Sequence, residues 1–280
     1  MTRYLVTGGC GFIGSHLVRR LLDESGTESI SVVDNLSSGS IERLGDAAAD
    51  SRVTIHQTDL ADHQSLAPLL GGIDHVFHFA ANPDIARAAT EPRIDFDQGT
   101  VLTQNLLDAM RVHNVPRLTY ASGSGVYGLR SHENPDENFG PLEPISTYGA
   151  SKLACEALIS AYCHMFGLAA CAFRFANVVG PRQTHGVVYD FVRKLRAEPS
   201  RLEVLGNGTQ RKSYIWVSDV IDAMRIAAPT SSEEFEVFNV GTRDSITVHR
   251  IAEIVSELMA PPDRKSTRLN SSHEWISRMP

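Results

Sequence analysis

A glycine-rich turn between an apolar strand pattern and an amphipathic helix pattern is the feature that most constrains the fold of this 280-residue chain. Residues 3–7 read as a short buried strand, and apolar residues at helical spacing occupy positions 17–22. Between them, Gly8 permits a tight turn, Gly11 lets a pyrophosphate approach the backbone, and Gly14 lets the helix pack on the strand. The helix N-terminus then faces the anion. This order of elements predicts a dinucleotide-binding unit.

An acidic residue at the end of the second strand pattern indicates which dinucleotide is bound. Residues 30–33 are apolar and lead into Asp34, twenty residues after Gly14. At this spacing a carboxylate can accept both ribose hydroxyls of an adenosine, and it would repel a 2'-phosphate. The sequence therefore favours NAD over NADP, although Arg43 is close enough in sequence to weaken the charge argument.

Composition narrows the class of protein. The chain is 42% hydrophobic and 21% charged with a net charge of −7, which is typical of a folded enzyme and argues against nucleic acid or an anionic membrane as the main partner. No apolar run is long enough to span a membrane, and Met1 leads directly into the first strand pattern, so we expect a cytoplasmic location. The cysteine and histidine spacings give no reason to expect a metal site.

Strand and helix patterns alternate through the first two thirds of the chain, which predicts a doubly wound parallel α/β sheet of the Rossmann type. Ligands of such sheets bind outside the carboxyl ends of the strands. The residues expected to border this crevice are Asp59, Leu60, Ala80, Ala81, Ser122 and Ser124. Residues 95–114 and 145–164 read as two long helices, whose exposed faces predict a homodimer held by a four-helix bundle.

Tyr148 and Lys152 form a candidate catalytic pair. Four-residue spacing on a helix stacks the phenol beside the ammonium, and a neighbouring cation favours the phenolate, which can remove a proton from a sugar hydroxyl. Two such residues also occur by chance on solvated helix faces. The predicted dinucleotide crevice is what favours the catalytic interpretation.

Six segments in this order resemble the motifs of extended short-chain dehydrogenases/reductases: residues 7–14, 34–39, 80–83, 126–128, 148–152 and 174–177. Within that superfamily the chain resembles the NAD-dependent epimerase/dehydratase family, and in it the UDP-glucose 4-epimerases. The resemblance implies a Rossmann domain with a smaller C-terminal α/β substrate domain, and epimerisation at C4 of a UDP-hexose through a transient 4-keto sugar. The further cofactor-binding residues that it implies are Phe12, Ile13, Asn35, Ser38 and Gly39, besides Tyr148 and Lys152.

One departure from the family pattern concerns the expected third catalytic group. The resemblance implies a Ser or Thr at the position of Gly123, which bridges the tyrosine and the sugar oxygen. Ser122 and Ser124 flank this position, and we favour Ser124 because the neighbouring glycines ease a small shift of the loop. Related 4,6-dehydratases carry an Asp-Glu pair where this chain has Ser124 and Gly125, so dehydration is disfavoured.

Two alternatives stay open at this point. The first is a UDP-glucuronate epimerase or decarboxylase, or another nucleotide-sugar enzyme, because the sequence does not display the shape of the sugar pocket. The second, from another class, is a non-catalytic NAD-binding regulatory protein. Retention of Tyr148 and Lys152 favours an enzyme.

The resemblance places the UDP-sugar in the last third of the chain, with substrate-binding candidates at Asn177, Val187, Val188, Arg211 and Lys212. Lys212 stands where the family has an arginine, and either Lys212 or Arg211 is expected to bind the diphosphate. We expect an NAD-binding domain over residues 1–176, to which the chain returns at about 214–228 and 237–240. Residues 177–262 are expected to be mainly a substrate-binding domain.

The sequence of the C-terminal residues indicates an unusual origin. Residues 263–273 read Asp-Arg-Lys-Ser-Thr-Arg-Leu-Asn-Ser-Ser-His, which can be encoded by the DNA of a widely used short-read sequencing adapter. We therefore expect residues 263–280 to be a non-native tail and the substrate domain to be truncated.

Overall fold

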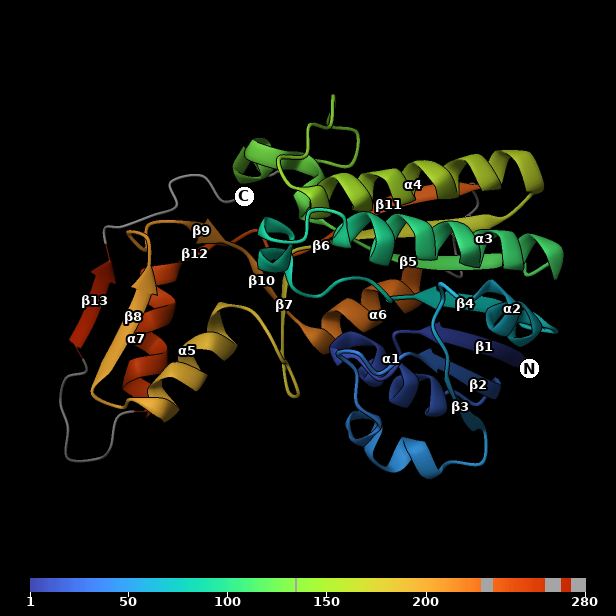
Figure 1. The fold of residues 1–280 in the computed structure, drawn as a ribbon, viewed down its shortest axis with the longest axis horizontal. Coiled ribbons are helices and arrows are strands. Elements are labelled where there is room, and N and C mark those ends of the chain that lie inside the picture. Colours follow the sequence, from blue (N-terminus) through green and yellow to red (C-terminus); the bar gives the residue numbers. More distant parts are fainter. Residues whose placement is uncertain (134, 228–233, 260–267, 273–280) are drawn as a thin grey trace. The chain divides into compact units, whose positions relative to one another are not determined.

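The structure is a computed structural model that describes residues 1–133, 135–227, 234–259 and 268–272 (Figure 1). The chain divides into two compact units. Unit 1 comprises Met1–Phe175 and Val217–Val240, and unit 2 comprises Ala176–Trp216 and Gly241–Pro280. Each unit is described by itself.

A parallel sheet of seven strands forms the centre of unit 1, in the order β11-β6-β5-β4-β1-β2-β3. The strands are β1 Thr2–Thr7, β2 Thr27–Asp34, β3 Val53–Gln57, β4 His75–His78, β5 Arg117–Gly123, β6 Ala169–Phe175 and β11 Phe235–Val240. Strand order reverses between β1 and β4, which is where ligands of open α/β sheets bind. The predicted doubly wound Rossmann fold is confirmed.

Helices cover both faces of this sheet (Figure 1). α1 (Phe12–Leu22) packs with α6 (Val217–Ala227) on one face, and α3 (Leu102–Val112) packs with α4 (Thr147–Phe166) on the other. Aliphatic side chains such as Leu5, Leu106 and Leu107, none of which is exposed, fill the core on the α3 and α4 side. The shorter helical segments are η1 Ile41–Ala49, α2 His63–Leu66, η2 Ala67–Leu70, η3 Ile85–Ala89 and η5 Ser124–Glu133.

The segment predicted as one helix over residues 95–114 begins with a π-helix, η4 (Phe96–Val101), before α3. A close contact explains why Gly99 lies inside η4. A Cβ atom at Gly99 would lie 2.3 Å from Ser151 Oγ of α4, so only glycine lets the two segments approach this closely.

Both termini of α4 have local signals in the sequence. Ser146 caps the N-terminus by accepting a hydrogen bond from Gly149 N at 3.0 Å, and Gly167 ends the helix in the left-handed conformation with φ 71°. The helix therefore begins next to Tyr148. Lys152 and Cys155 lie on its buried face.

Unit 2 contains short strands and two helices. The strands are β7 Asn177–Val179, β8 Arg201–Leu205, β9 Arg211–Lys212, β10 Tyr214–Trp216, β12 Ile246–Thr247 and β13 Arg268–Ser272, and the helices are α5 Val187–Ala197 and α7 Val248–Met259. Phe191 and Leu195 of α5 pack with Leu202 of β8 and Val255 of α7 in a small apolar core.

One boundary differs from that expected from the sequence. Ile246 belongs to β12, which pairs with β9, and the last helix α7 begins at Val248. β10 pairs with β7 inside unit 2, and the chain returns to unit 1 at Val217. Of the predicted non-native tail, residues 268–272 form β13 beside β8, and the rest lies outside the described residues. The origin of this tail stays a prediction.

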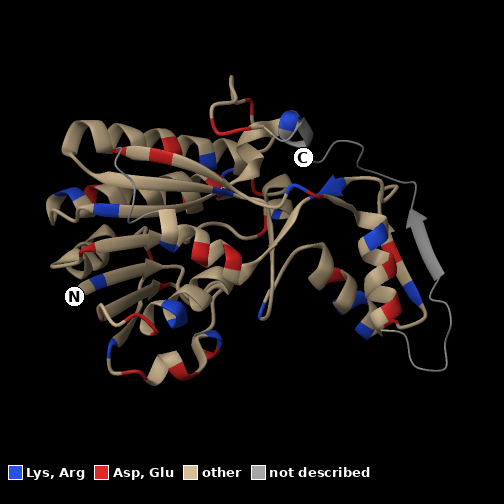
Figure 2. Ribbon diagram, turned by 180° about the vertical axis from the view of Figure 1, so that it is seen from behind, with Lys and Arg blue, Asp and Glu red and all other residues tan. Residues whose placement is uncertain are grey.

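Acidic and basic residues are interspersed along the described helices and loops (Figure 2). Among the described residues, no helix is long and apolar enough to cross a membrane.

Candidate active site

The glycine turn after β1 approaches the end of β4 too closely for any side chain. Gly8 has φ +65°, and a Cβ atom there would lie 2.8 Å from Ala80 N. A Cβ atom at Gly14 would lie 2.4 Å from Gly8 O. The N-cap of α1 is Gly11, which contributes no side-chain cap. α1 therefore begins at the point where the strand order reverses, and its first backbone amides include those of Phe12 and Ile13. This geometry fits a pyrophosphate.

Asp34 ends β2 as a buried carboxylate with only 7% of its surface exposed. Its oxygens accept hydrogen bonds from Cys10 N and Leu36 N, both at 2.9 Å. A Cβ atom at Gly39 would lie 2.6 Å from Asp34 Oδ1, so Gly39 is needed for the loop to close over the carboxylate. Because an ionised carboxylate has about four acceptor sites, Asp34 keeps capacity for the hydroxyls of a ribose. This arrangement fits NAD.

The loops that follow β2, β3 and β4 are linked to one another. Asn35 Nδ2 donates to Asp59 Oδ2 at 2.9 Å, and Asn105 Nδ2 of α3 donates to Leu60 O at 3.0 Å. Ala80 N donates to Thr7 Oγ1 at 3.3 Å, while Ala81 is half-buried. The cofactor candidates predicted from the sequence therefore lie on connected loops at the carboxyl edge of the sheet.

Arg43, whose positive charge weakens the argument for NAD over NADP, donates hydrogen bonds to the backbone of these loops. Its Nη1 donates to Ser38 O at 2.8 Å and to Cys10 O at 3.2 Å. The guanidinium thus stabilises the loop beside Asp34.

Tyr148 and Lys152 lie one turn apart at the start of α4. The Lys152 side chain is buried and its Nζ donates to Ala121 O of β5 at 2.7 Å. The ammonium also lies 4.9 Å from the centroid of the Tyr120 ring and 5.7 Å from that of Tyr148. Lys152 is therefore fixed between β5 and the ring of the candidate base.

The protonation of this pair differs from the sequence expectation. Burial and the charge of Asp95 raise the pKa of Tyr148 to about 12, whereas Lys152 was expected to lower it. Burial lowers the pKa of Lys152 to about 8, against the opposing effects of Cys155, Glu156 and Asp95. The physical reason is that burial of both groups disfavours their charged forms, an effect that residue spacing does not encode.

The three residues at the end of β5 have different surroundings. A Cβ atom at Gly123 would lie 3.7 Å from the Tyr148 hydroxyl oxygen, an ordinary contact distance, so a side chain at this position would touch the tyrosine. Ser122 is buried and its Oγ donates to Glu156 Oε1 at 2.5 Å. Ser124 is exposed, and its side chain has no hydrogen-bond partner among the described residues.

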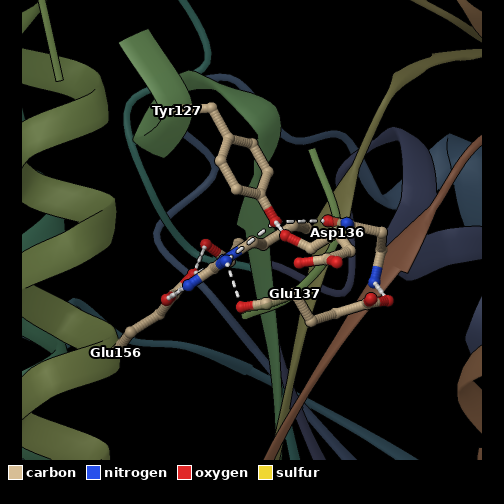
Figure 3. Close-up of polar contacts among 7 residues, drawn as sticks. Tyr127, Asp136, Glu137 and Glu156 are labelled. Atoms are coloured by element: carbon tan, nitrogen blue, oxygen red, sulfur yellow. Dashed lines mark hydrogen bonds and ion pairs between the residues drawn. The ribbon is translucent and has the colours of Figure 1, made fainter. Parts of the chain in front are cut away.

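Ser122 contacts Glu156, which belongs with Tyr127 to a buried polar network at the end of the sheet (Figure 3). Arg174 of β6 forms an ion pair with Glu156 of α4, with 2.7 Å between Nη2 and Oε2, and these side chains are only 5% and 4% exposed. Arg174 Nη1 donates to the Tyr127 hydroxyl at 2.8 Å. Tyr127 in turn donates to Asn239 Oδ1 of β11 at 2.8 Å. The network therefore ties the loop that contains Gly123 and Ser124 to α4, β6 and β11.

Glu156 and Asp95 were not among the site residues predicted from the sequence. Glu156 follows Lys152 by four residues and so continues the helical stripe of Tyr148 and Lys152, a signal that could have identified it. Asp95 is 2% exposed and accepts hydrogen bonds from Thr147 Oγ1 at 2.7 Å and from Asn82 Nδ2 at 2.8 Å. No local sequence pattern distinguishes Asp95 from an acidic residue exposed to solvent.

In unit 2 the two candidate cations have different environments. Arg211 is exposed and donates to Ser245, through Nε to Oγ at 2.9 Å and through Nη2 to the backbone oxygen at 2.5 Å. Lys212 is half-buried, has no hydrogen-bond or ion-pair partner among the described residues, and its pKa is lowered by burial. Asn177 Nδ2 donates to Ser213 O at 3.0 Å, next to Lys212 in the chain.

The two valine candidates begin α5. Val187 and Val188 are both half-buried and pack against the apolar core of unit 2. Asn177 and the cations lie on β7 and β9.

Comparisons with known proteins agree with this geometry. Residues 4–241 match the profile of the NAD dependent epimerase/dehydratase family. The UDP-glucose 4-epimerase of Mycolicibacterium smegmatis is 32% identical over 269 residues, which cover 93% of this chain and 84% of the relative. A crystal structure of a UDP-galactose 4-epimerase is 39% identical with a TM-score of 0.82, covering 98% of this chain and 87% of its own.

A relative with another activity is also similar. A dTDP-glucose 4,6-dehydratase from Streptomyces venezuelae, whose structure has NAD bound, is 28% identical with a TM-score of 0.85 and covers 96% of this chain and 84% of its own. The family predicted from the sequence motifs is confirmed, and the chain belongs to the NAD dependent epimerase/dehydratase family.

Proposed function

We propose that this protein is an NAD-dependent epimerase that inverts C4 of a UDP-hexose, interconverting UDP-glucose and UDP-galactose through a transient 4-keto sugar. NAD is the cofactor of its family. The observation that carries the proposal is the pair of half-buried Tyr148 and buried Lys152 at the start of α4, next to the end of β5.

The residues of the site have roles that follow from their chemistry. The glycine turn and Asp34 would hold NAD, which when bound would supply reversible hydride transfer at sugar C4. Tyr148 takes the proton of the 4-hydroxyl and later restores it, so it acts as base and acid in turn. Lys152 is held by Ala121 O and, as the family resemblance implies, also binds the nicotinamide ribose.

Ser124, and not Ser122, is proposed to assist Tyr148. The Ser122 hydroxyl donates to Glu156 at 2.5 Å and is buried, whereas the Ser124 hydroxyl is exposed. We expect Ser124→Ala to lower kcat about tenfold or more, within the range for loss of a group that assists proton transfer. Full turnover by Ser124→Ala would rule out this role.

Lys212 is proposed to bind the diphosphate of the UDP-sugar. The Arg211 guanidinium already donates to Ser245, whereas Lys212 lacks a partner within the described chain. We expect Lys212→Gln to raise the KM for UDP-sugar about tenfold and Arg211→Gln to raise it much less. The reverse order would assign the diphosphate to Arg211.

Two alternatives are distinguished by substrate. A UDP-glucuronate epimerase or decarboxylase would act on UDP-glucuronate and not on UDP-glucose. The dehydratase relative is matched in fold, but Ser124 and Gly125 supply no acid and base for the elimination of water. A non-catalytic NAD-binding protein would convert no UDP-sugar.

The decisive experiment follows UDP-glucose and UDP-galactose with the purified protein and no added NAD. Bound cofactor is released from a second sample and identified. We expect interconversion of the two sugars, retention of NAD, and loss of turnover in Tyr148→Phe. Retained NAD without conversion of any UDP-hexose would instead favour the regulatory protein.

We also propose a cytoplasmic homodimer in which α3 and α4 of two copies form a four-helix bundle. Val112, Met165 and Phe166, near the C-terminal ends of these helices, are 54%, 71% and 48% exposed, which supports an apolar contact. Analytical ultracentrifugation at micromolar concentration tests this assembly, and a monomeric mass would reject it.

A further inference from the structure

Asp95 is a buried carboxylate without a cationic partner. It is 2% exposed, and both hydrogen bonds to its oxygens come from neutral donors, Thr147 and Asn82. No ion pair within the described part of the chain involves it. An ionised carboxylate that is removed from water is costly unless its charge is compensated, so such a group at a candidate active site calls for a functional explanation.

The contacts of Asp95 surround the catalytic pair. Thr147, which donates to its carboxylate, precedes Tyr148, and Ser151, which donates to Asp95 O at 2.7 Å, precedes Lys152. On its other side, Asn82 follows the loop of Ala80 and Ala81 that borders the glycine turn. Asp95 therefore joins the cofactor side of the site to the first turn of α4.

We propose that Asp95 is a positioning residue of the active site, whose hydrogen bonds fix Thr147 and Asn82 and whose negative charge acts on the Tyr148–Lys152 pair. This inference rests on the proposed function. The charge favours the ammonium of Lys152 and disfavours the phenolate of Tyr148.

The other ionisable groups around the pair are paired or neutral. Glu156 of α4 also raises the pKa of Lys152, but its carboxylate forms an ion pair with Arg174 of β6 at 2.7 Å. Burial keeps His78 of β4 neutral, with its pKa lowered to about 3, and raises the pKa of Tyr120 of β5 far above its usual value.

Cys155 of α4 is the remaining ionisable group near the pair. It is buried and accepts a hydrogen bond from Thr103 Oγ1 through its sulfur at 3.2 Å. Among the described groups whose charge affects the pKa of Lys152, Asp95 is therefore the carboxylate that has no ion-pair partner.

The Asp95→Asn variant tests the charge while keeping the shape. Asn retains an oxygen that accepts from Asn82 and gains an amide that can donate to the Thr147 hydroxyl. Carbon-13 NMR of labelled lysine side chains follows the titration of Lys152, assigned with Lys152→Met. We expect Asp95→Asn to lower the pKa of Lys152 by at least about half a unit below its value near 8. Because the site uses Lys152 as an ammonium, the alkaline limb of the kcat profile should move to lower pH by the same amount.

Two further variants separate charge from structure. Asp97→Asn removes a carboxylate two residues away that is 49% exposed and paired with Arg93, so the titration of Lys152 should not change. Thr147→Val removes a hydrogen bond to Asp95 but keeps its charge, so it should lower the melting temperature without lowering the pKa of Lys152.

The outcomes distinguish this inference from the proposed function. An unchanged Lys152 titration in Asp95→Asn, or an equal shift in Asp97→Asn, would overturn it. If Asp95→Asn does not fold, a lowered pKa in Thr147→Val would overturn it, because that variant keeps the charge. The NMR titration needs no substrate. A protein with the expected shift but no epimerisation would therefore contradict the proposed activity and not the action of Asp95 on Lys152.

Discussion

Removal of the charge of Glu156 gives a strong test of the buried network at the end of the sheet. In Glu156→Gln the side-chain oxygen can still accept from Ser122, but the new amide faces the Arg174 guanidinium, donor against donor. The two side chains are only 4% and 5% exposed, so water cannot replace the lost carboxylate. Removal of one partner of such a buried pair costs about 3–5 kcal/mol.

The expected change is large enough to measure directly. For a unit of this size, each kcal/mol moves the melting temperature by about 2–4 °C, so the transition of unit 1 should move down by roughly 10 °C. Calorimetry follows that transition. Glu91→Gln is the matched control, because Glu91 pairs with Arg87 at 2.9 Å but the two side chains are 51% and 49% exposed. A surface pair of this kind contributes at most about 1 kcal/mol.

A double variant separates the ion pair from the general cost of substitution. In Glu156→Gln with Arg174→Met, the uncompensated guanidinium is gone, so the double variant should be more stable than the sum of the single effects by about 2 kcal/mol or more. Additive effects, or a Glu156→Gln protein that melts within about 2 °C of the parent, would refute the interpretation that this pair stabilises the end of the sheet.

Two further predictions concern backbone geometry and pH. Gly8→Ala should lower the amount of NAD retained on purification and cost about 1–2 kcal/mol, because its Cβ atom would lie 2.8 Å from Ala80 N, whereas Gly26→Ala, which meets nothing within 4 Å, should retain the cofactor. The folded-state pKa values of His75 and His78 are lowered to about 3 by burial, so only the unfolded chain binds their protons between about pH 6.5 and 3. Stability should therefore fall by about 2 kcal/mol per histidine between pH 7 and pH 5. Urea titrations at both pH values should show a smaller loss in His75→Gln and in His78→Gln, and an unchanged loss would contradict the assignment of buried neutral imidazoles.

Much of the fold was predictable because its signals are local. The order of strand, glycine turn and helix at residues 3–22 follows from short-range patterns, and the structure shows the close contacts that require glycine at Gly8 and Gly14. The π-helix before α3 was not predictable, since it depends on the approach of Gly99 to Ser151 of α4, far along the chain.

The sequence offered candidate site residues but could not show their hydrogen bonds. Position 123 was identified as the departure from the family pattern, yet the sequence could not show that Ser122 is held by Glu156. This contact joins a strand end to a helix that lies 34 residues away in the chain. The Tyr127 hydroxyl likewise meets Asn239 across 112 residues. Contacts of such separation depend on how the strands are ordered, which periodicity alone does not determine.

Residue spacing predicted the wrong direction for the pKa of the candidate base, Tyr148. Four-residue spacing places Tyr148 next to Lys152, but the net effect on each pKa depends on burial and on which other charges the fold brings near. Glu156, which forms an ion pair with Arg174 at 2.7 Å, raises the pKa of Lys152, and so does Asp95. Asp95 accepts only neutral hydrogen bonds, so its charge acts on the pair. The protonation of the candidate base is therefore a property of the folded core around α4, and it can be altered at Asp95 without changing Tyr148 or Lys152.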